Sequence, residues 1–248
     1  VLSRDSMRPG TLLVLLSLYS ATPLAHSQAR RALLVGINLY QPPNTTAKRP
    51  IGSSGGRFEL TKFPNLDGSL NDVAALRDLL ASPKFGFAPD HIAVLTNPGL
   101  PQSRLPFVVL PPDQTRHDGL LAVMRKYLVD LPQRGDTVVF YYAGHGSLRV
   151  NSLGTKLTIT LPDGKLSHAD STLVPSDAWS GAYDLLDVET TKIFNAALDK
   201  GVHLTVILDS CNSGAFTRGI RVGRQPRARM LVYDPRDIAE APPDKVKA

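Results

Sequence analysis

Residues 204–214 read LTVILDSCNSG, an apolar run that leads through Asp209 to the only cysteine of the chain, Cys211. Residues 138–147 read VVFYYAGHGS, a second apolar run that ends in His145 between two glycines. Short apolar runs bounded by small residues predict buried strands. Because parallel strands gather reactive groups at their carboxyl ends, we expect the Cys211 thiol and the His145 imidazole at one edge of one sheet.

Strand and helix patterns alternate along the rest of the chain. Strands are predicted over 32–37, 91–95, 137–142 and 204–208, helices over 70–80, 120–128 and 185–198, a hairpin over 157–165, and loops over 41–65 and 100–112. Asp67 or Ser69 is predicted to cap the first helix, and Asp113 or Thr115 stands near the start of the second. This alternation predicts an α/β fold with a mostly parallel sheet.

The composition is that of a globular chain. Of 248 residues, 42% are hydrophobic and 20% charged, and the formal net charge is +6. The positive charge is not spread through a recognisable nucleic-acid motif, so no nucleic-acid partner is expected. A lone cysteine forms no internal disulfide, which leaves it either buried and inert or kept free for chemistry.

Residues 1–27 are predicted to be a secretory signal peptide that is removed from the mature chain. Met7 and a basic residue precede the apolar run TLLVLLSL at 11–18, and small residues at Ala25 and Ser27 come before Gln28. The alternatives are a membrane anchor or a buried strand, but the run is short for spanning a bilayer. We therefore expect an exported protein, periplasmic or secreted, with no stable membrane anchor.

The surroundings of Cys211 and His145 favour chemistry over packing. Small residues follow the cysteine, and a thiol at such a turn is typical of an exposed nucleophile. Gly144 and Gly146 clear space beside the imidazole, as an acid–base histidine requires. The structural alternatives are a buried thiol and a histidine that only satisfies hydrogen bonds. Together the pair predicts a cysteine hydrolase.

Five segments, in this order, resemble the caspase-like cysteine peptidases, and more closely the metacaspases and their bacterial relatives. The segments are 36–40 (GINLY), 66–72 (LDGSLND), 144–147 (GHGS), 171–177 (STLVPSD) and 209–214 (DSCNSG). The resemblance implies a caspase-like three-layer α/β/α sandwich with a mostly parallel central sheet. It also implies a peptidase domain over 28–217.

The resemblance further implies a role for each residue. Cys211 would attack a peptide carbonyl, and His145 would assist the thiol and protonate the leaving amine. The backbone N–H groups of Gly146 and Cys211 would hold the oxyanion, as donors fixed by glycine-rich turns can. The partners would be protein or peptide substrates.

Two aspartates carry the expected substrate preference. In metacaspases, acidic residues at the motif positions of Asp72 and Asp209 shape a pocket for Arg or Lys before the cut. The alternative for Asp72 is a charge favoured by the helix dipole, and for Asp209 it is a turn or capping aspartate.

The chain also departs from the family pattern. Ser69 stands where many metacaspases have cysteine. No dense acidic loop of the kind that holds calcium is recognised, so no metal or other cofactor is predicted, with calcium activation kept as an alternative.

Residues 218–248 are predicted to be a basic linker and C-terminal segment. This region is short for the family's small-subunit half, so we expect that half to be incomplete. Five arginines lie from Arg218 to Arg229. They form either a solvated loop or a site of self-processing by a peptidase that cuts after Arg. Two rival functions remain, a non-catalytic caspase-like binding or signalling module and a thiol acyltransferase.

Overall fold

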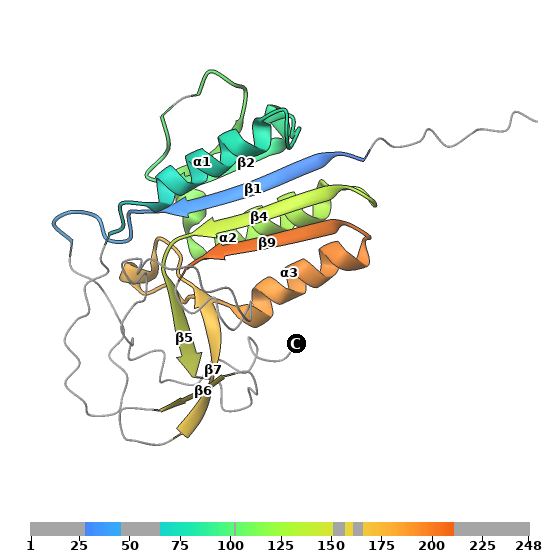
Figure 1. Cartoon of the computed structure of the whole chain (residues 1–248). Coiled ribbons are helices and arrows are strands. Elements are labelled where there is room, and N and C mark those ends of the chain that lie inside the picture. Colours follow the sequence, from blue (N-terminus) through green and yellow to red (C-terminus); the bar gives the residue numbers. More distant parts are fainter. Residues whose placement is uncertain (1–27, 46–64, 102, 151–156, 161–165, 211–248) are drawn as a thin grey trace, which may run out of the picture.

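The computed structural model describes residues 28–45, 65–101, 103–150, 157–160 and 166–210 (Figure 1). The predicted signal peptide, Cys211 and the basic segment 218–248 lie outside the described residues. So does most of the predicted loop over 41–65.

A five-stranded sheet in which every neighbouring pair is parallel forms the centre of the described part, in the order β3-β2-β1-β4-β9 (Figure 1). Its strands are β1 (Arg30–Ile37), β2 (Ile92–Asn97), β3 (Val108–Leu110), β4 (Thr137–Ala143) and β9 (His203–Asp209). The four longer strands confirm the apolar runs seen in the sequence. β3 falls in the stretch 100–112, which was predicted as a loop, and that prediction is wrong at this point.

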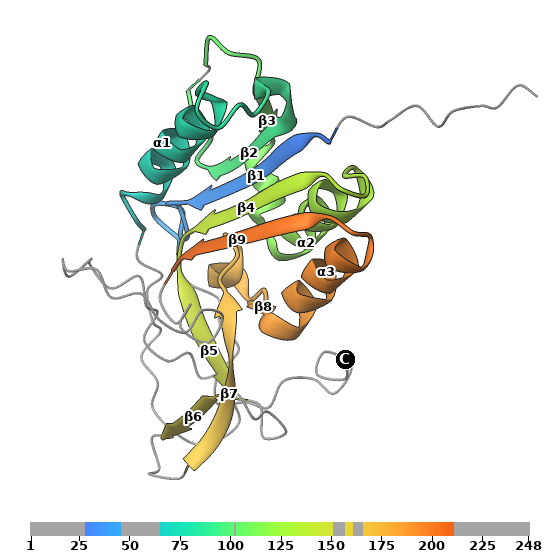
Figure 2. The ribbon, with the colours of Figure 1, turned by 45° about the vertical axis from the view of Figure 1, so that its right-hand side comes forward.

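Helices cover both faces of the sheet (Figure 2). α1 (Ser69–Ala81) lies on one face, while α2 (His117–Arg125), its π-helical continuation η3 (Lys126–Asp130) and α3 (Asp187–Asp199) lie on the other. Residues of β1 alternate between the two cores: Leu34 packs with α1, and Leu33 packs with α2. Burying each such leucine stabilises the fold by about 2 kcal/mol. The three-layer α/β/α prediction is confirmed. No helix in the described ranges combines the length and apolar character needed to cross a membrane.

A second, smaller antiparallel sheet follows the carboxyl end of β4. Its strands are β5 (Gly146–Val150), β6 (Leu157–Thr160), β7 (Leu166–Leu173) and β8 (Leu185–Leu186). The pairing of β6 with β7 confirms the predicted hairpin, whereas β5 and β8 were not predicted. β7 returns the chain to the main sheet, because the Val174 N–H donates to the carbonyl of His145 at 3.1 Å.

The predicted cap of the first helix is wrong. Gly68 precedes α1 and no side chain of its own segment caps it. Instead Asn38, from the loop after β1, accepts a hydrogen bond from the Ser69 N–H at 3.0 Å. The second helix begins at His117, because Pro112–Thr115 forms a separate 3₁₀ turn, η2.

Close packing ties α1 to β1. A Cβ atom at Gly36 would lie 2.8 Å from a Val73 methyl carbon and 3.0 Å from the Ser69 carbonyl oxygen. Real side chains do not approach this closely, so the glycine lets the helix rest directly on the strand. Together with Asn38, this contact fixes the first turn of α1 at the carboxyl end of β1.

Asp136 ties the opposite, amino-terminal edge of the sheet together. Its fully buried carboxylate accepts hydrogen bonds from the Ala29 and Gln133 N–H groups, both at 2.9 Å, and from Arg31 Nε at 3.4 Å. Burial by itself would raise the pKa of this carboxyl. The hydrogen bonds from Gln133, Ala29 and Arg31 outweigh burial and leave the pKa of Asp136 below its usual value.

Asp136→Asn is expected to lower the free energy of unfolding at neutral pH by about 2 kcal/mol, because the amide cannot accept all three bonds. A carboxyl whose pKa is lowered by folding stabilises the protein above its unfolded-state pKa of about 4, and that contribution is lost as pH falls through the folded-state value. Urea unfolding at pH about 7 and about 3 should therefore show a smaller loss on acidification in the variant. Asp130→Asn, at an exposed position, is the control. An equal acid sensitivity in both variants would contradict this role of Asp136.

Candidate active site

His145 comes directly after β4 and is held on both sides of its backbone. Its N–H donates to the hydroxyl oxygen of Tyr40 at 2.6 Å. Its carbonyl accepts from the Tyr142 hydroxyl at 2.9 Å and from the Val174 N–H. The imidazole packs against the Tyr40 ring, with centroids 4.5 Å apart and planes at 51°, and the residue is only 1% exposed. His145 is therefore fixed in both backbone and ring position.

The residue before the histidine must be glycine. A Cβ atom on Gly144 would lie 2.7 Å from the Tyr142 hydroxyl oxygen and would come into closer conflict with the Tyr40 hydroxyl. The glycine at 144 thus makes room for the two phenols, and its predicted role of clearing space beside the imidazole stays a prediction.

Asp209 ends the strand next to that of His145. In the parallel register of β4 and β9, Ala143 pairs with Asp209. The Asp209 side chain is exposed, and one of its carboxylate oxygens accepts from the Tyr141 hydroxyl at 3.2 Å. Because side chains alternate along a strand, Asp209 lies on the face of the sheet that α1 covers, as do Tyr141 and Ala143.

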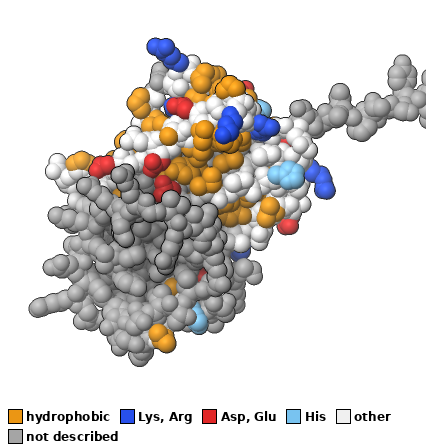
Figure 3. Space-filling model, in the orientation of Figure 1, with side chains coloured by type: hydrophobic (Ala, Val, Ile, Leu, Met, Phe, Trp, Pro, Cys, Tyr) orange, Lys and Arg blue, Asp and Glu red, His pale blue; other side chains and the backbone are white. Residues whose placement is uncertain are grey.

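Asp72 reaches the same edge and the same face from a helix. It is half-buried in the first turn of α1, and its N–H donates to the Gly68 carbonyl at 3.0 Å. Val73, the next residue after Asp72, and Tyr141, which donates to Asp209, belong to the same α1 core. Both aspartates therefore lie on the α1 face of the sheet. Figure 3 shows acidic side chains gathered near this carboxyl-terminal edge.

Gly146, the predicted oxyanion donor, is the first residue of β5 and pairs with Leu173. It lies at the point where the chain leaves the parallel sheet for the smaller one (Figure 1). The structure therefore places His145, Gly146, Asp72 and Asp209 at one edge. Cys211 follows Asp209 by two residues and lies outside the described residues.

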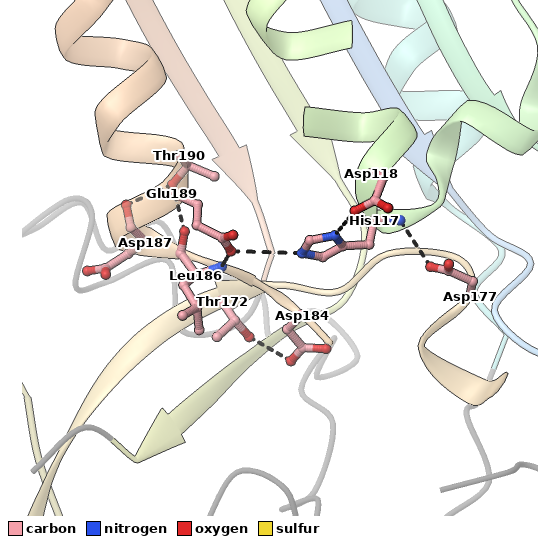
Figure 4. A network of polar contacts seen from close by, with 9 residues as sticks. All are labelled: His117, Asp118, Thr172, Asp177, Asp184, Leu186, Asp187, Glu189 and Thr190. Carbon is pink, nitrogen blue, oxygen red and sulfur yellow. Dashed lines mark hydrogen bonds and ion pairs between the residues drawn. The ribbon is translucent and has the colours of Figure 1, made fainter. Parts of the chain in front are cut away.

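A separate polar network joins α2 and α3 to the chain after β7 (Figure 4). His117 Nδ1 lies 2.7 Å from Asp118, and its Nε2 lies 3.8 Å from Glu189. The His117 N–H donates to Asp177 at 3.1 Å, and Glu189 accepts from the Leu186 N–H at 3.1 Å. Asp177, the aspartate of the segment 171–177, therefore holds the first residue of α2 in place through this hydrogen bond.

Within the described ranges, no group of three or more His, Cys, Asp or Glu side chains is arranged to hold a metal ion.

Tyr40 and Tyr142 are the site residues that sequence reasoning missed. Tyr142 was assigned only to a strand, and Tyr40 only to a motif match. The signal available in the sequence was the glycine at 144, which had to make room for large neighbours as well as for the imidazole.

Comparisons with known proteins agree on one family. The family model described as metacaspase, peptidase C14 domain, matches residues 30–218. Metacaspase-1 of Arabidopsis thaliana is 32% identical over 169 residues, which cover 68% of this chain and 40% of that protein. Metacaspase-1 of Schizosaccharomyces pombe is 28% identical over 185 residues, 75% of this chain and 34% of that protein. Metacaspase-9 of Arabidopsis thaliana is 32% identical over 164 residues, 62% of this chain and 41% of that protein.

The chain thus spans about two fifths or less of these curated relatives. A solved structure of a protein from Geobacter sulfurreducens matches with a TM-score of 0.42 and 21% identity, over 74% of this chain and 50% of that chain.

Proposed function

Since this chain belongs to the metacaspase family, whose model matches residues 30–218, we propose that it is a cysteine endopeptidase with Cys211 as nucleophile and His145 as acid–base residue. The observation that carries the proposal is the register of β4 and β9. Ala143 pairs with Asp209, and His145 and Cys211 each follow by two residues. Chain geometry keeps the Cα atoms of Asp209 and Cys211 within about 7 Å of one another.

The chemistry then follows in balanced steps. The Cys211 thiolate attacks the carbonyl carbon of the scissile peptide, and the N–H groups of Gly146 and Cys211 would stabilise the oxyanion. The intermediate collapses with loss of the amine, which takes a proton from the His145 imidazolium. Water, giving a proton to His145, then attacks the thioester, and the C–S bond breaks to restore the thiolate.

We propose that the cut follows Arg or Lys. Asp72 and Asp209 both lie on the α1 face of the edge that carries His145. Two carboxylates on one face of this edge attract a guanidinium or ammonium group and repel an Asp side chain. By the same chemistry the arginines from Arg218 to Arg229 are proposed self-processing sites.

The test is cleavage of fluorogenic peptides ending in Arg, Lys or Asp by the full chain in reductant. Peptides ending in Arg or Lys are expected to be cleaved, and Cys211→Ala should abolish the reaction. Cleavage that survives in this variant, or no cleavage of any peptide, would contradict the proposal. Parallel assays in calcium and in chelator decide between the predicted metal independence and calcium activation, and mass spectrometry of the incubated chain detects cuts within 218–229.

Export is proposed on the signal-peptide pattern of residues 1–27. Expression in a secreting host, followed by N-terminal sequencing of the exported fraction, should give a chain that begins at Gln28. A protein retained in the cytoplasm with its leader intact would contradict this proposal.

A further inference from the structure

Two fully buried tyrosines meet beside His145. Tyr40 lies three residues beyond β1 and Tyr142 lies in β4, the neighbouring parallel strand. Both are 0% exposed, and their hydroxyl oxygens are 3.3 Å apart. Both belong to the core on the α2 and α3 face, the face opposite to that of Asp72 and Asp209.

One assignment of protons satisfies the contacts of this pair. The Tyr40 oxygen accepts from the His145 N–H, and the Tyr40 proton is donated to the Tyr142 oxygen. The Tyr142 proton is then donated to the carbonyls of His145 and Val174, both at 2.9 Å. Each phenol must stay protonated for this to hold, and burial raises the pKa of Tyr142 well above its usual value.

The two hydroxyls act on the same residue. Tyrosines in a core commonly bond to any nearby carbonyl, whereas here one phenol binds the N–H of His145 and the other binds its C=O. The Tyr40 ring also contacts the imidazole face, 4.5 Å between centroids. The fit leaves no room for a Cβ at position 144.

We propose that Tyr40 and Tyr142 are positioning residues for the acid–base histidine, holding its backbone and ring in the orientation that proton transfer needs. This inference rests on the proposed role of His145. Neither phenol lies on the face of the aspartates, so both should affect the chemical step and leave substrate recognition unchanged. Displacing a catalytic group by about 1 Å can cost about 10²-fold in rate.

Tyr40→Phe and Tyr142→Phe test the proposal, since each keeps the ring and removes one hydroxyl. In the full chain, each is expected to lower kcat for an Arg-ended peptide by about 10- to 100-fold with KM within about twofold. The second readout needs no substrate: the pH dependence of Cys211 alkylation by iodoacetamide. A well-placed imidazolium lowers the thiol pKa, so the midpoint should move to higher pH in both variants.

Thr190→Val is the matched control, because the buried Thr190 hydroxyl donates to the backbone carbonyls of Leu186 and Asp187 where α3 begins. It should lower the melting temperature while leaving kcat and the alkylation midpoint unchanged. If the tyrosine variants behave like this control, the hydroxyls are only structural and the inference is overturned. If His145→Ala abolishes turnover while both tyrosine variants match the wild type, the inference fails and the proposed function stands. If His145→Ala changes neither kcat nor the midpoint, the proposed function fails, and the inference fails with it.

Discussion

His145→Ala is expected to reduce kcat/KM for an Arg-ended peptide by about 10³-fold or more. An acid–base residue typically contributes 10²- to 10⁴-fold, and in a thiol dyad the imidazolium also stabilises the thiolate. The loss should appear in kcat, because His145 is held by Tyr40 and Tyr142 in a position that would serve proton transfer. Steady-state kinetics with the peptide of the functional assay provide the measurement.

His203→Ala is the matched control for this variant. His203 is exposed and begins β9, at the opposite edge of the same sheet, where it pairs with Thr137. Its loss should leave kcat/KM within about twofold of the wild-type value. Equal activity in the His145 and His203 variants would remove the acid–base role from His145.

The parallel sheet could be predicted because the local sequence pattern of each longer strand is enough to recognise it. Strands covered on both faces are continuous apolar runs, and residues 32–37 of β1 are all buried. β3 escaped prediction because it has three residues between prolines at 106 and 111. β5 escaped because Arg149 interrupts its pattern, yet Arg149 is only 4% exposed and its guanidinium lies 4.8 Å from the centre of the Tyr183 ring. Tyr183 lies 34 residues after Arg149 in the chain, so no local pattern contains this contact.

In the candidate site, too, local features could be predicted from the sequence and contacts between distant residues could not. His145 could be found from its flanking glycines. Its hydrogen bond to Tyr40 could not, because the two residues lie 105 positions apart in the chain. The cap of α1 likewise comes from Asn38, 31 residues before Ser69. Such contacts depend on which strands become neighbours, and the sheet order β2-β1-β4-β9 does not follow from apolar periodicity. The roles given to Cys211 and to the segments 1–27 and 218–248 remain predictions.

The two faces of the sheet edge have different proposed tasks. Tyr40 and Tyr142 hold His145 from the α2 and α3 face, whereas Asp72 and Asp209 lie on the α1 face. A substitution on one face should therefore alter the chemical step and a substitution on the other should alter the choice of substrate. The tyrosine variants test the effect on the chemical step, and removing the charge of Asp209 tests the effect on the choice of substrate.

Asp209→Asn is expected to reduce kcat/KM for an Arg-ended peptide by about 10²-fold, in line with the loss of one partner of a charge-assisted pair. Asparagine keeps the size of the side chain and a carbonyl oxygen that can accept from the Tyr141 hydroxyl, so the change isolates the charge. A citrulline-ended peptide, the uncharged analogue of the arginine peptide, is the matched substrate. Wild-type protein should strongly prefer arginine to citrulline, and the variant should lose most of that preference.

Asp72→Asn should act in the same direction, since Asp72 reaches the same face of the edge from α1. Asp90→Asn, at an exposed position in the turn before β2, should leave the ratio of arginine to citrulline cleavage unchanged. Because Asp209 is exposed, its contribution should also weaken as salt is raised, with a screening length of about 8 Å at physiological ionic strength. A preference for arginine that survives both Asp72→Asn and Asp209→Asn would show that other groups recognise the residue before the cut, and the pair would then serve only the local structure of a helix start and a strand end.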